Sequence, residues 1–345
     1  MSSTLENLMH VNTRQLKEQL THVFASKLVP FVRSAPGIGK SAVYRHIAEM
    51  FNLELIDIRL SMYEPQDFSG LPFREDGKTV YLPTSLFPLA GRDQIPNGKD
   101  GWLILLDEFT HGSPEMMRAT YKLILDRMVG ERKLHDDAYV ALAGNGIDDN
   151  ALAGAVGTAI NSRVTHLHLK TNTKVWIEDV AIPFNFDHRV IGFISANGNK
   201  LNDFDPEQDD HSFACERTWE FVSKIISSHK HNVEHLMPVI AGTISPGIAA
   251  EFVQFCAIYQ SLVKVSDIIR DPVNTNLPSD NAIRWAMTTQ LADACDANNV
   301  DPICQYVDRM PVQYAIIFMK MILTKKELMS TEAVGNLLKK VGKLC

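Results

Sequence analysis

The chain has 345 residues, of which 45% are hydrophobic and 22% are charged, so it can bury more than one core and we expect at least two domains. The formal net charge of −7 argues against a protein that holds nucleic acid through bulk charge. No apolar run of about 18 residues is present and residues 1–20 lack a continuous apolar core, so we expect a cytoplasmic protein with neither membrane span nor secretory signal.

The first half of the chain predicts an α/β fold. An amphipathic helix is expected over about Thr13–Ala25, and strand-length apolar runs separated by helical patterns follow it. Nearly continuous Val, Ile and Leu content is typical of parallel strands that are covered on both faces, which predicts a five-stranded parallel sheet between helices. The five runs are Leu28–Ser34, Leu53–Leu60, Trp102–Phe109, Ala138–Asn145 and Val164–Lys170.

Two inserts interrupt this alternation. Asp76–Gly77 lies between strand-like arms in LPFREDGKTVYLP, which is a two-residue hairpin signal. RMVGERKLHDDAYVAL, beginning at Arg127, resembles a second hairpin that leads into the fourth strand. A plain surface loop is the alternative at both places.

The second half predicts helices only. After Lys170, apolar residues fall at helical intervals, as in TWEFVSKIISS and QYAIIFMKMIL. Pro, Asn and Asp cluster in VKVSDIIRDPVNTNLPSDN, which suggests a boundary there. We therefore expect residues 1–170 to form the α/β domain, 171–265 a helical domain and 266–345 a helical extension.

The stretch RSAPGIGKSAVYRHIAEMF, Arg33–Phe51, nearly matches the phosphate-binding pattern G-x-x-x-x-G-K-[ST]. Backbone N–H groups around its glycines would surround a β-phosphate, and the following helix would direct its positive end at the anion. Lys40 would reach the β- and γ-phosphates, and Ser41 would ligate Mg²⁺. Ser34 stands where the pattern has its first glycine, and a strand–helix turn without ligand is the alternative. The predicted nucleotide-binding residues are Pro36, Gly37, Ile38, Gly39, Lys40, Ser41 and Ala42.

Polar side chains end two later strands. WLILLDEF closes with Asp107 and Glu108, and VALAGN closes with Asn145. A magnesium–nucleotide site needs a carboxylate at the carboxyl end of a neighbouring strand, and a second carboxylate beside it can polarise the attacking water. Taken alone, each of these residues could simply form a turn after its strand, because Asp and Asn are common in turns. Together with the phosphate motif they predict a nucleotide-hydrolysing site.

In this order SAPGIGKS, LILLDEF, ALAGN, INSRVTHL and ACERTWEFVS resemble the motifs of AAA+ ATPases over roughly residues 10–265. YEPQDFSGLP followed by a hairpin is most similar to the MoxR-type branch. The resemblance implies ATP and Mg²⁺ as cofactors, Ser41 and Asp107 as metal ligands, and an α-helical lid over residues 171–265.

The resemblance also assigns roles at four further positions. It implies that Glu108 activates water and that Asn145, as sensor 1, orients that water. Arg163 matches the arginine finger, although Val164 stands where phenylalanine is frequent, and Arg217 matches sensor 2. A finger serves the neighbouring subunit, which implies a homo-oligomer, by analogy a hexameric ring. Arg127 and Arg132 are alternative subunit-facing arginines.

MoxR-type relatives commonly remodel a partner protein, often with a von Willebrand factor A domain protein. We therefore expect ATP hydrolysis coupled to chaperone-like remodelling of a protein client. Two alternatives are an AAA+ nucleic-acid motor or clamp-loader-like ATPase, which the acidic balance disfavours, and a nucleotide-gated assembly scaffold with little turnover.

Other candidate sites are weaker. His231–His235 formally matches H-x-x-E-H, but no third zinc ligand can be named. His166 and His168 alternate along a strand, so they share one face, where a structural role is expected. The five cysteines contain no Cys-x-x-Cys pair, which favours free thiols in a reducing compartment. They are Cys215, Cys256, Cys295, Cys304 and Cys345.

Overall fold

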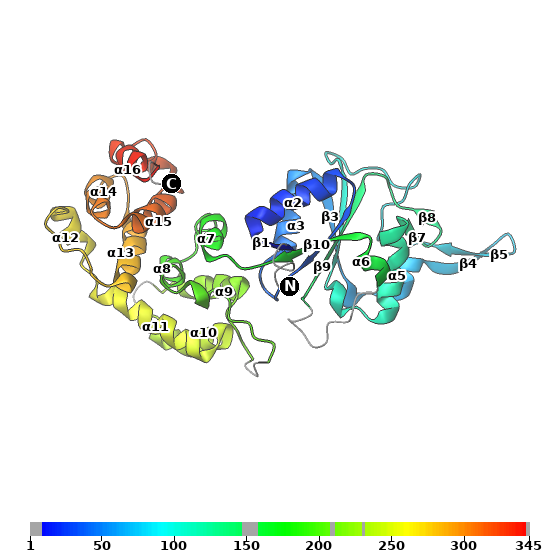
Figure 1. The fold of residues 1–345 in the computed structure, drawn as a ribbon, viewed down its shortest axis with the longest axis horizontal. Coiled ribbons are helices and arrows are strands. Elements are labelled where there is room, and N and C mark those ends of the chain that lie inside the picture. The colour runs from blue at the N-terminus through cyan, green and yellow to red at the C-terminus, as the bar shows by residue number, and fades with distance from the viewer. Residues whose placement is uncertain (1–8, 147–157, 208–210, 230–231, 343–345) are drawn as a thin grey trace, which may run out of the picture. The chain divides into compact units, whose positions relative to one another are not determined.

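The computed structural model describes residues 9–146, 158–207, 211–229 and 232–342 (Figure 1). The chain divides into two compact units, one of residues 1–171 with 205–207 and the other of residues 172–204 with 208–345. The first is α/β and the described part of the second is helical, so the predicted fold class is confirmed.

The first unit is built on a parallel sheet of six strands in the order β1-β10-β2-β9-β6-β3. The prediction of five strands was one short because it missed β1. This strand has only two residues, which pair with β10, and two residues are too few to form a recognisable sequence pattern. The strands are β1 His10–Val11, β2 Val29–Arg33, β3 Leu53–Arg59, β6 Gly101–Asp107, β9 Ala138–Gly144 and β10 Val164–Leu169.

Helices cover both faces of this sheet (Figure 1). On one face α2 (Thr13–Ala25) and α3 (Lys40–Met50) bury Leu16, Leu20 and Tyr44 against the strands. On the other, α5 (Pro114–Leu125) packs with the short helices α4 (Pro65–Ser69) and α6 (Thr158–Asn161). This double cover explains why β6, an interior strand of the sheet, is buried at every position.

Both inserts form antiparallel hairpins, one of β4 (Leu71–Glu75) with β5 (Lys78–Leu82) and one of β7 (Met128–Val129) with β8 (Arg132–Lys133). Asp76 and Gly77, in the first turn, have φ of 49° and 76°, the pair of positive values that a type I′ turn requires.

The described part of the second unit has two clusters of buried side chains. One surrounds Trp219 and Phe193, and the other surrounds Tyr306 and Phe318. The division of this unit near residue 265 stays a prediction. Its described α-helices are α7 Thr173–Trp176, α8 His188–Ala196, α9 Glu216–Ile226, α10 Met237–Ile244, α11 Pro246–Ser261, α12 Val265–Arg270, α13 Asn281–Ala294, α14 Val300–Asp308, α15 Val312–Ile322 and α16 Glu332–Gly342.

Among the described residues, no helix combines the length and the apolar character needed to cross a bilayer. No group of three or more His, Cys, Asp or Glu residues there is arranged to hold a metal, and His231 lies outside those residues. Four cysteines are free and buried, while Cys345 lies outside the described part; the four are Cys215, Cys256, Cys295 and Cys304.

Candidate nucleotide site

The loop between β2 and α3 has the backbone of an anion-binding turn. Gly37 and Gly39 have φ of 80° and 96°, values that strain any residue with a side chain. Gly39 is the N-cap of α3 and has no side chain, so it supplies no capping acceptor to the first turn of the helix. Buried Ile38 anchors the loop, and the Tyr44 hydroxyl donates to Leu142 O at 3.0 Å, which fixes α3 to the sheet.

The Lys40 side chain turns back across this loop. Its Nζ donates to Ser34 Oγ at 2.9 Å, to Ser34 O at 3.1 Å and to Ala35 O at 3.3 Å. It also donates to Asn145 Oδ1 at 3.2 Å, across 105 positions of sequence. The structure thus brings together two of the predicted residues, and it adds Ser34 as a direct partner of the lysine.

The two predicted magnesium ligands are in contact. The Ser41 hydroxyl donates to Asp107 Oδ2 at 2.7 Å, and the Glu108 N–H donates to Asp107 Oδ1 at 2.8 Å. Burial, and then the charge of Asp107, raise the pKa of nearby Asp57 above its ordinary value. A hydroxyl and a carboxylate at an acidic edge are the hard oxygen donors that Mg²⁺ prefers, so these residues fit that ion.

Glu108 lies in an unusual backbone conformation. Its φ of 55° is left-handed, which costs a non-glycine residue about 1 kcal/mol or more and is characteristic of functional sites. Ser61, just beyond β3, donates its hydroxyl proton to Glu108 Oε2 at 2.7 Å. Sequence reasoning missed Ser61, because a serine after a strand is common turn chemistry.

Asn145 is held by a second residue that the sequence did not reveal. Its N–H donates to Thr110 Oγ1 at 3.0 Å, and Thr110 is buried in the turn that follows Glu108. A Cβ on Gly144 would come within 2.9 Å of the Thr110 side chain, so only glycine fits beside it. The turn after β6 therefore positions the amide at the end of β9.

Within the first unit, the predicted arginines lie outside this group of contacts. Arg163 is exposed just before β10, at the amino edge of the sheet, and its Nη1 donates to Ala159 O at 3.0 Å. Arg217 is exposed near the start of α9, in the other compact unit. Arg127 is half-buried and donates to His135 O and Ala138 O, so its guanidinium is engaged within its own chain. Arg132 is exposed on β8.

No family model matches this chain, and no curated protein matches its sequence. Solved structures similar to it include a candidate ATPase from Cytophaga hutchinsonii, with a TM-score of 0.36 and 11% identity over 96% of this chain and 90% of that one. A RuvB mutant from Thermotoga maritima has a TM-score of 0.41 and 12% identity over 78% of both chains. NtrX from Brucella abortus in complex with ADP has a TM-score of 0.40 and 12% identity over 99% of this chain and 71% of its own. Similarity at this level carries no argument about activity.

Proposed function

We propose that this chain is a Mg²⁺-dependent ATPase of the AAA+ class, of the MoxR-type branch, that couples hydrolysis to remodelling of a protein client. The observation that carries the proposal is the convergence of Lys40, Ser41, Asp107, Glu108 and Asn145 at the carboxyl edge of β2, β6 and β9. Ligands bind at this edge in open parallel sheets.

Each member of the group has a distinct proposed task. Lys40 and the loop N–H groups would hold the phosphates, and Ser41 and Asp107 would hold Mg²⁺, whose charge would offset the charge on the phosphates. Glu108 would accept a proton from the water that attacks the γ-phosphorus, while Asn145 would orient that water. ADP and phosphate are the products.

Two exposed features support an assembled form that acts on protein. Arg163 is exposed at the sheet edge opposite the site, as a finger offered to a second copy must be. The β4–β5 hairpin exposes Leu71 and Phe73 at 57% each and Leu82 at 45%, which suits an apolar protein segment better than a phosphate backbone. We propose a hexameric ring with a protein client, and with a von Willebrand factor A protein as a candidate partner.

Phosphate release by wild-type protein and by Glu108→Gln tests the assignment. We expect turnover to fall about 10²- to 10⁴-fold, because an amide cannot accept the water proton, while binding of a fluorescent ATP analogue persists. Glu54→Gln, which changes an exposed carboxylate on β3, is the matched control and should retain wild-type turnover. Equal phosphate release by Glu108→Gln and wild type would reject Glu108 as the base.

A further inference from the structure

A line of polar contacts joins the strand that leads into the phosphate loop to the segment that carries Arg163. Arg33, the last residue of β2, lies with its Nη1 3.2 Å from His166 Nδ1. The other ring nitrogen, His166 Nε2, lies 3.2 Å from the carbonyl oxygen of Asn161, two residues before Arg163. The imidazole therefore bridges β2 and the end of α6.

The chemistry of the two partners determines the state of this ring. A guanidinium can only donate a hydrogen bond and a carbonyl oxygen can only accept one. His166 must therefore accept at Nδ1 and donate from Nε2, which only the neutral imidazole protonated at Nε2 can do. A second proton on the ring would place two N–H groups against each other at Arg33 and break that contact.

The surroundings of His166 favour the neutral form. Arg33 faces it from β2, with its guanidinium carbon 4.1 Å from the centre of the Phe31 ring. His168 lies on the same face of β10, and the His10 ring on β1 is 5.7 Å from that of His168. The pKa of His166 is lowered by burial, against the bond to Asn161 O that raises it, and lowered further by the charge of Arg33. Among the described residues, no carboxylate contributes to this shift.

We propose that His166 is a positioning residue that sets where Arg163 is presented to a second copy of this chain; this rests on the proposed function. Arg163 is exposed, and within the described part of the chain its side chain donates hydrogen bonds to Ala159 O and Ser162 Oγ, both close in sequence. Its segment is anchored by fully buried Ile160 and by the bond from His166 to Asn161. Because Arg33 directly precedes the phosphate loop, the same bridge links the protomer's own nucleotide site to the arginine it offers its neighbour.

A mixing experiment separates this role from a general loss of structure. His166→Phe keeps a planar ring but loses both polar contacts, and we expect its turnover to fall about 10- to 100-fold, as misplaced catalytic groups do. Addition of Lys40→Ala protomers, which cannot hold ATP but keep Arg163, should restore turnover at the intact sites of His166→Phe protomers. His168→Phe, two residues along the same face, is the control and should remain near wild type.

Arg163→Ala mixed with Lys40→Ala is the reference for the proposed function. If that pair recovers turnover and the His166→Phe pair does not, or if His166→Phe alone equals wild type, the role of His166 is rejected and the trans-acting finger stands. If Arg163→Ala equals wild type, the finger itself is rejected.

The pH profile gives a test that needs no change at His166. The ratio of wild-type turnover to Arg163→Ala turnover should fall at acidic pH, because protonation of His166 removes the bridge. Since its pKa is lowered, the fall should begin below the ordinary histidine range and be absent at pH 7. A ratio that stays constant over the whole acidic range in which the wild-type protein remains folded would contradict the proposal.

Discussion

At the scale of single residues, Ser34 alters the contacts of the proposed phosphate loop. It is buried at the end of β2, and its hydroxyl accepts from Lys40 while donating to Ala35 O at 2.8 Å. The glycine of the general motif could make neither contact. The serine side chain would therefore compete with a phosphate for the lysine ammonium.

Ser34→Ala should tighten ATP binding about 2- to 10-fold, because one hydrogen bond that holds Lys40 in the ligand-free state contributes about 0.5–1.5 kcal/mol. Isothermal titration calorimetry with a non-hydrolysable ATP analogue would measure the change in affinity. Ser85→Ala removes an exposed hydroxyl elsewhere in the same unit and should leave the affinity unaltered. Weaker binding by Ser34→Ala would show that the serine assists the lysine instead of competing for it.

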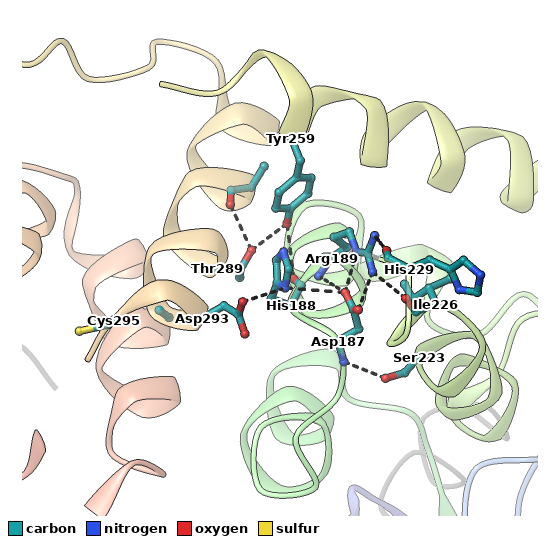
Figure 2. Close-up of polar contacts among 12 residues, drawn as sticks. Asp187, His188, Arg189, Ser223, Ile226, His229, Tyr259, Thr289, Asp293 and Cys295 are labelled. Carbon is teal, nitrogen blue, oxygen red and sulfur yellow. Dashed lines mark hydrogen bonds and ion pairs between the residues drawn. The ribbon is translucent and has the colours of Figure 1, made fainter. Parts of the chain in front are cut away.

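At the scale of helices, a buried ion pair ties α8 to the end of α9 (Figure 2). Arg189 is only 3% exposed, and it donates to both carboxylate oxygens of Asp187 at 2.7 and 2.8 Å. It also donates to Ile226 O at 2.9 Å and to His229 O at 2.7 Å. Burial would raise the pKa of Asp187, but the hydrogen bond from Arg189 and the charges of His188 and Arg189 hold it below its ordinary value. The Arg189 side chain therefore neutralises the buried carboxylate and also donates hydrogen bonds to carbonyl groups at the end of α9.

Arg189→Leu should lower the free energy of unfolding by about 3–5 kcal/mol, because it leaves a buried carboxylate and two carbonyl groups without their donor. Urea denaturation followed by circular dichroism would measure the loss. Arg270→Leu breaks the exposed pair with Asp267 and should cost about 1 kcal/mol or less. Similar losses for the two variants would contradict a special contribution from Arg189.

At the same scale, local sequence patterns were sufficient for most of the first unit. The helix over Thr13–Ala25 was predicted with the ends that it has, and the five long strands lie within the predicted runs to about one residue. Runs of apolar residues, and the Gly, Asp and Asn residues that end them, can be recognised from neighbouring positions in the sequence. The strand β1 was missed because two residues stabilised only by pairing with β10 have no periodicity.

At the scale of the whole molecule, the proposed function needs a residue from a second copy. The phosphate loop follows the carboxyl end of β2, whereas Arg163 precedes β10, whose first residue Val164 pairs with the first residue of β2, Val29. The two lie at opposite edges of the same sheet. An arginine at the amino edge can reach a γ-phosphate only in another protomer.

Turnover per protomer should therefore rise with protein concentration and reach a plateau once assembly is complete. Arg163→Ala should stay about 10³-fold or more below that plateau at every concentration, since an arginine finger contributes on that order. Phosphate release measured across a dilution series, alongside light scattering, would test this. Wild-type activity per protomer that stays constant on dilution to single chains would exclude a contribution from a second copy.

The sequence by itself determined the α/β class of the first unit, the glycine turn between β2 and α3 and the acidic strand end, because these depend on residues that are close together along the chain. Only the tertiary structure decided which polar groups meet: Ser34 with Lys40, Ser61 with Glu108, and Thr110 with Asn145. Those contacts depend on the order of strands in the sheet, and that order arises from pairing between segments that sequence spacing does not specify. The same order separates Arg163 from the site of its own chain, a separation that no local pattern records.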